Sequence, residues 1–107
     1  MREEHFTLDR RGALLRSVTP RRGTPYEHRC TLESFEAVAH AIDEAAAGFV
    51  LEEIIAAEDL PSSQAATAIA FLKERGCVRV EGKRSYPASG CVHLDAMTEY
   101  HALKTGG

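Results

Sequence analysis

The thiol and imidazole groups near the end of the chain are the side chains whose types suit a metal ion. Cys91 and His93 are separated by a single residue, and His101 follows further on. Zinc prefers such ligands and takes four of them in structural sites. A fourth ligand would have to come from Cys30, His28 or a second subunit, and the spacing lacks a two-plus-two pattern. We therefore expect no metal and no other cofactor, with these residues serving as scattered structural ones, and a zinc site is the weaker alternative.

Catalytic patterns are absent from the sequence. It contains no glycine-rich phosphate loop, no nucleophile elbow and no helical His-Glu-x-x-His motif. We therefore expect a protein that is not an enzyme.

Arginine side chains, which bind phosphate, are concentrated in the first third of the chain. Residues 1–30 contain seven arginines and four acidic residues, a net charge of +3, whereas residues 31–107 contain six basic and twelve acidic residues, a net charge of −6. This asymmetry fits either an electrostatic footprint for phosphate or a solvated, arginine-rich loop. Arg21 and Arg22 stand in the segment 19–25, whose prolines and glycine exclude regular structure. Such a segment can follow a DNA minor groove, or it can be a linker between two elements.

A helix, a tight turn and a second helix are expected in the middle of the chain. The first helix spans residues 51–59, and Pro61 cannot continue its hydrogen-bond ladder. Ser62 and Ser63 can cap the second helix, and Gly76 supplies the left-handed residue that closes it. The apolar residues at helical spacing in the second helix are Ala65, Ile69 and Leu72.

An alternating stretch after the second helix predicts a two-stranded hairpin over residues 78–86, with its turn at Gly82-Lys83. Together these elements resemble the winged helix-turn-helix fold of small prokaryotic transcription regulators. The residues that carry the resemblance are Leu60-Pro61-Ser62-Ser63-Gln64, the run 68–76 and the hairpin 77–86, which would be the wing.

The fold class that this resemblance implies is α+β, mainly α, with a three-helix core and a β-hairpin wing. Residues 1–30 would form a basic N-terminal hairpin or arm, and residues 31–107 the winged-helix domain with a C-terminal helix. Within the arm, strands on either side of an Asp9–Gly12 turn are expected. The first helix of the winged-helix domain, which precedes the helix pair described above, would begin after Thr31 and end near Gly48.

The resemblance also implies contacts with DNA. In this fold the N-terminal residues of the second helix reach base edges in the major groove, and the wing straddles the adjacent backbone. Glutamine can pair with adenine through two hydrogen bonds. Val78 and Val80 would face the core, so that the basic wing residues point outward. The expected DNA-binding residues are Ser62, Ser63, Gln64 and Thr67 on the helix, Arg79, Lys83 and Arg84 on the wing, and Arg21 and Arg22 on the N-terminal segment.

A winged helix can also be a protein-interaction module that does not bind DNA. The second helix has no basic residue before Lys73, and the helix 51–59 is acidic, so that its surface repels phosphate. We keep both hypotheses: a DNA-binding transcription regulator, and a winged-helix module that binds an acidic protein.

Residues 26–30 are expected only to lead into the first helix, and residues 92–103 to form the last one. These two helices would lie side by side and support a twofold homodimer. The three cysteines are an odd number without framework spacing, and no apolar run approaches the ~20 residues that cross a bilayer. Without an apolar signal core at the N-terminus, we expect a cytoplasmic protein with reduced thiols.

Overall fold

The computed structural model describes residues 3–105, which form an α+β fold with four helices and two antiparallel sheets. Arg2, one of the seven N-terminal arginines, lies outside the described residues. Along the chain the elements are β1 (Glu3–Leu8), β2 (Leu14–Thr19), β3 (Tyr26–Cys30), α1 (Leu32–Asp43), α2 (Leu51–Glu58), α3 (Ser62–Glu74), β4 (Val78–Glu81), β5 (Arg84–Pro87) and α4 (Val92–Lys104). No helix within this part of the chain is long and apolar enough to cross a membrane.

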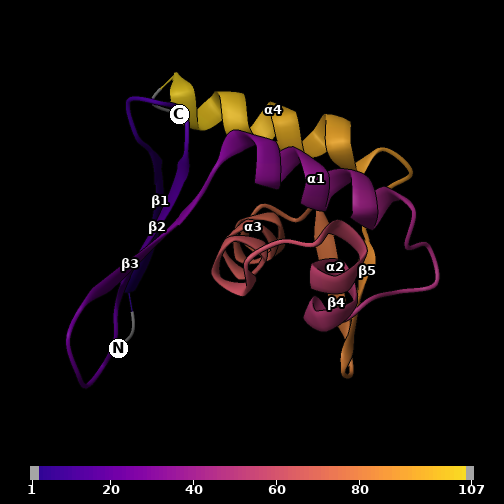
Figure 1. Ribbon diagram of the computed structural model, residues 1–107, viewed down its shortest axis with the longest axis horizontal. Coiled ribbons are helices and arrows are strands. Elements are labelled where there is room, and N and C mark those ends of the chain that lie inside the picture. Colours follow the sequence, from indigo (N-terminus) through magenta and orange to yellow (C-terminus); the bar gives the residue numbers. More distant parts are fainter. Residues whose placement is uncertain (1–2, 106–107) are drawn as a thin grey trace.

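The N-terminal sheet and the helices share one hydrophobic core. The sheet has the order β1-β2-β3 and packs against α3, while α1 contacts both α3 and α4 (Figure 1). Phe71 of α3 stands where these layers meet, with its ring centroid 5.3 Å from that of Phe6 and 5.8 Å from that of Phe35. The Cα radius of gyration is 13.3 Å, the value of about 13 Å typical of one domain of this size. Residues 3–30 are therefore part of the folded body.

The predicted N-terminal hairpin is confirmed, and Asp9 organises its turn. β1 pairs with β2 in a register that places Phe6 opposite Arg16. One carboxylate oxygen of Asp9 accepts hydrogen bonds from the backbone N–H groups of Arg11, at 2.8 Å, and Ala13, at 2.9 Å. Gly12 has a φ of +84°, which a left-handed turn position requires. The hydrogen bond from Ala13 is the main cause that lowers the pKa of Asp9 below its ordinary value of 3.8.

An Asp9→Asn variant should be less stable than the parent at neutral pH. Because the pKa of Asp9 is lowered by folding, its ionised form stabilises the native state above pH 3.8, and this contribution is lost as the pH falls through the folded-state pKa. The difference in melting temperature between the two proteins should therefore be largest at neutral pH and smaller at about pH 3. A gap of equal size at both pH values would contradict the role of the charge.

Residues 26–30 form a third strand rather than a mere lead-in to the first helix. This strand pairs with β2, and only Cys30 of its five residues is buried. Tyr26, its other hydrophobic residue, is 42% exposed, and pairing with β2 supplies the stabilisation that the local sequence does not indicate. Residues 3–30 therefore form a three-stranded sheet, which has one strand more than the predicted hairpin.

The first helix begins after Thr31 as predicted, but ends at Asp43 rather than near Gly48. The Asp43 carboxylate accepts hydrogen bonds from the backbone N–H groups of Val92, at 2.6 Å, and His93, at 2.9 Å. It thereby satisfies two of the free donors at the start of α4. The chain then turns, and Phe49 forms an isolated bridge with Ser85 of β5.

The hairpin β4–β5 has the predicted register, with Arg79 opposite Tyr86 and Glu81 opposite Arg84. The expectation that Val80 faces the core is wrong: Val80 is 54% exposed. Val78 is buried at the base of the hairpin, and Ser85 is buried where it pairs with Phe49, whereas Val80, opposite Ser85, stays open to solvent. The predicted capping of the second helix by serine is also wrong, because Ser62 and Ser63 lie inside α3 and Pro61 precedes it without a side-chain cap.

Candidate nucleic-acid interface

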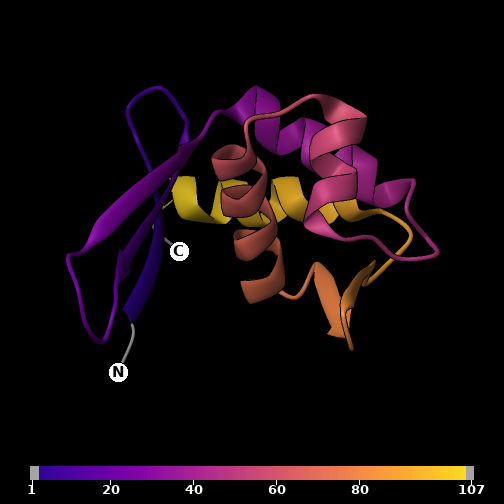
Figure 2. The ribbon, with the colours of Figure 1, turned by 60° about the horizontal axis from the view of Figure 1, so that its bottom comes forward.

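The face of α3 that is open to solvent lies between the N-terminal sheet and the hairpin β4–β5 (Figure 2). Ser62, Ser63 and Lys73 are exposed on it, while Ala66 and Ala70 are half-buried between them. A groove of about 630 Å³ runs along this face. It is lined by Glu4 and Arg16 of the sheet, Leu51 of α2, and Ala66, Ile69, Ala70, Lys73 and Glu74 of α3. The helix is therefore the floor of a groove between the N-terminal sheet and the start of α2.

Two of the four predicted base-contacting residues are not available for that role. Thr67 is completely buried, and its hydroxyl donates a 2.7 Å hydrogen bond to the backbone oxygen of Ser63, so its assignment to DNA contact is wrong. Gln64 is half-buried, and its side-chain oxygen accepts from the backbone N–H of Thr31 at 3.0 Å and from the Thr31 hydroxyl at 3.3 Å. Gln64 thus ties the start of α3 to the start of α1. Ser62 and Ser63 remain exposed at the helix start.

The three predicted cations of the hairpin differ in whether an acidic side chain pairs with them. Arg84 donates to the backbone oxygen of Gly48 at 2.8 Å and to the carboxylate of Glu53 at 2.9 Å, so it holds the hairpin to the helical body. Arg79 pairs with the exposed Glu81 and lies 5.0 Å from the centre of the Tyr86 ring. Lys83, at the hairpin tip, is exposed and has no ionic partner among residues 3–105.

The loop between β2 and β3 carries Arg21 and Arg22, which are both exposed and have no acidic partner in the described chain. In Figures 1 and 2, this loop and the tip of β4–β5 extend toward the same side of the molecule, with α3 between them. Lys73 was not among the DNA-binding residues predicted from the sequence, and it adds a further cation at the groove floor. Its helical spacing from Ala66 and Ala70 was the signal that could have placed it on this face.

The residues considered for a metal site are not gathered into one. Within residues 3–105, no three His, Cys, Asp or Glu side chains form a group that could hold a metal ion. The Nε2 atom of His93 lies 3.0 Å from a Glu36 carboxylate oxygen, and its ring stacks on His40 at 3.9 Å. Burial raises the pKa of Cys30 to about 12 and that of Cys77 to about 11, so both thiols are protonated at neutral pH.

The fold and this face define a small α+β protein in which a groove-floor helix lies between two β-structures, each with an exposed basic tip. Comparison of the chain with models of known families, with curated proteins and with solved structures finds no match. The function therefore has to be inferred from the residues and their geometry.

Proposed function

We propose that this protein is a winged-helix DNA-binding protein that acts as a transcription regulator. The order α1, α2, α3 and then β4–β5 agrees with a three-helix core followed by a wing. Two backbone hydrogen bonds between Phe49 and Ser85, at 2.8 and 2.9 Å, pair the segment before α2 with β5 as a one-residue third strand beside the wing. These features support the winged-helix assignment without reference to any one side chain in the groove.

The observation that carries the proposal is the placement of four exposed cations without ionic partners in the described chain. Lys73 lies in the groove along α3, Lys83 lies at the wing tip, and Arg21 and Arg22 lie on the loop between β2 and β3. Each cation that neutralises a phosphate releases counterions and so favours binding. Because these cations come from three separate elements around α3, they can contact the two sides of a duplex that lies against this face.

Recognition of bases is expected to be limited. Ser62 and Ser63 are the exposed polar residues at the start of α3, and a serine hydroxyl can contact several bases or a phosphate. Gln64, the residue best suited to adenine, is occupied by Thr31. We therefore propose binding that depends mainly on phosphate contacts, with a modest sequence preference. Pairing of two copies through α1 and α4 would double these contacts.

The test is fluorescence anisotropy of a labelled random-sequence duplex titrated with the protein. Phosphate-driven binding should give a Kd in the micromolar range at about 50 mM salt, and the affinity should fall steeply toward about 200 mM. Four phosphate contacts correspond to a slope of about −3.6 in log K against log salt concentration. Absence of binding at the lower salt concentration would overturn the proposal. A palindromic site selected from a random duplex pool would also indicate a twofold dimer.

A protein-interaction module is the second candidate. It is favoured because two of the polar side chains at the start of α3 are not available to contact bases. Burial of Thr67 and the Thr31 contacts of Gln64 remove two base-reading groups. In addition, α2 and its C-cap expose four acidic side chains, which repel phosphate. These are Glu52, Glu53, Glu58 and Asp59. If the duplex does not bind at low salt, the groove along α3 becomes the candidate surface for a protein partner.

A further inference from the structure

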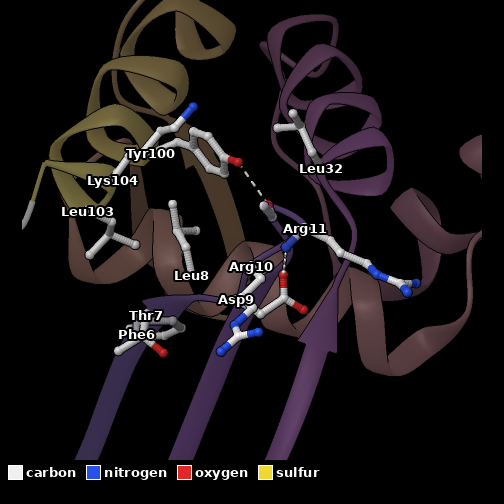
Figure 3. Close-up of a pocket in the computed structure, with 11 residues that line it drawn as sticks. Phe6, Thr7, Leu8, Asp9, Arg10, Arg11, Leu32, Tyr100, Leu103 and Lys104 are labelled. Carbon is white, nitrogen blue, oxygen red and sulfur yellow. Dashed lines mark hydrogen bonds between the residues drawn. The ribbon is translucent and has the colours of Figure 1, made fainter.

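A second cavity lies at the opposite end of the N-terminal sheet from the loop that carries Arg21 and Arg22. It occupies about 690 Å³ between the β1–β2 turn, the start of α1 and the last turns of α4 (Figure 3). This volume is within the range of about 300–1,000 Å³ that is typical of small-molecule sites. The cavity is lined by Phe6, Thr7, Leu8, Asp9, Arg10, Arg11, Gly12, Leu32, Tyr100, Leu103 and Lys104.

Three leucine side chains form an apolar part of the cavity wall. Leu8, Leu32 and Leu103 are only partly covered by the protein, although they pack against the core. The Tyr100 hydroxyl also lies in the cavity lining, and it donates a 2.8 Å hydrogen bond to the backbone oxygen of Gly12. Since that donor is already used, the leucine side chains offer a surface that an alkyl chain can cover favourably.

The rim of the cavity is positively charged. Arg10, Arg11 and Lys104 are exposed, and the described chain contains no ionic partner for any of them. Asp9 is the only acidic residue among those that line the cavity, and its carboxylate pairs with Arg29. In Figure 3 the side chains of Arg10 and Lys104 lie on either side of Leu8, whereas that of Arg11 extends away from Leu8 and Leu103. Such side chains can reorient while their aliphatic stems remain against apolar surface.

We propose that this cavity binds an amphipathic carboxylate of the medium-chain fatty acid type. The alkyl chain would cover Leu8, Leu32 and Leu103, and the carboxylate would pair with the cations at the rim. An arginine guanidinium can bind a carboxylate through two parallel hydrogen bonds. A cationic amphiphile would meet like charges at the same rim, and a neutral one would leave them unpaired. The site is separate from the DNA-binding face and does not depend on it.

Titration of the purified full chain with decanoate tests the proposal, with decanol and decyltrimethylammonium as matched ligands of the same alkyl length. Isothermal titration calorimetry measures the binding. We expect saturable binding of one decanoate per chain and at least tenfold weaker binding of both other compounds. The affinity should rise with chain length from hexanoate to decanoate, by up to about fourfold for each methylene that is buried. Equal affinity for decanol, or no saturable binding of decanoate, would overturn the proposal.

Two double variants with equal loss of charge locate the site. Arg10→Gln/Arg11→Gln should weaken decanoate binding at least tenfold, whereas Arg21→Gln/Arg22→Gln, at the other end of the sheet, should leave it unchanged. Leu103→Gln should also weaken binding, because it places an amide where the alkyl chain would lie; its melting curve reports whether the fold is kept. Equal loss in the two arginine variants would indicate non-specific charge attraction and would contradict this site. Because no DNA is present, the result is independent of the proposed function.

Discussion

A Phe71→Ala variant is expected to lose about 3–5 kcal/mol of unfolding free energy. Phe71 is completely buried in α3, and its ring packs edge-on against Phe6 of the sheet and Phe35 of α1. On another side the Arg75 guanidinium lies 5.2 Å from its centre. Truncation therefore removes contacts that join the sheet to two helices and leaves a cavity that α-helical neighbours cannot fill by local repacking.

Urea denaturation followed by circular dichroism measures this loss as a lower transition midpoint. Leu94→Ala is the matched control, because Leu94 is 64% exposed on α4 and its truncation should change stability by no more than about 0.5 kcal/mol. If Phe71→Ala cost as little as this control, the sheet and helices would not share the core described above. A large loss for both variants would place Leu94 in an interface between copies of the chain.

The elements with strong local signals could be predicted from the sequence. Pro61 separates α2 from α3, and Gly76, with a φ of +77°, closes α3 as expected. The apolar residues predicted to form the buried side of α3 are all buried: Ala65, Ile69 and Leu72. The register of β4–β5 followed from its two-residue turn. In each case a short stretch of residues determines the local backbone, so tertiary context was not needed.

The accessible face of α3 could not be predicted, because it depends on a distant segment. The N-terminal sheet packs against α3, and this sheet includes the strand at residues 26–30 that has no clear sequence pattern. Thr67 can be buried at low cost because its hydroxyl bonds to the carbonyl four residues earlier. Gln64 contacts a residue 33 positions away in the chain. Neither arrangement leaves a signal within the helix itself.

Removal of the unpaired cations around α3 should nearly abolish the salt dependence of duplex binding. If Arg21, Arg22, Lys73 and Lys83 each neutralise one phosphate, their simultaneous replacement by glutamine should make the slope less negative by about 3.6. The affinity should fall for all duplex sequences alike, since phosphate contacts carry no base information. All four side chains are exposed, so the melting temperature of the variant should change little.

Comparison of the two double arginine variants makes this prediction specific to one face. Arg21→Gln/Arg22→Gln should reduce the steepness of the salt dependence by about 1.8, which corresponds to two lost phosphate contacts. Arg10→Gln/Arg11→Gln removes the same charge from the opposite end of the sheet and should retain the parental slope. An equal change in both would mean that DNA responds only to the net charge of the chain. A change confined to the first variant would support phosphate contacts at the β2–β3 loop, which extends toward the same side of the molecule as the tip of β4–β5.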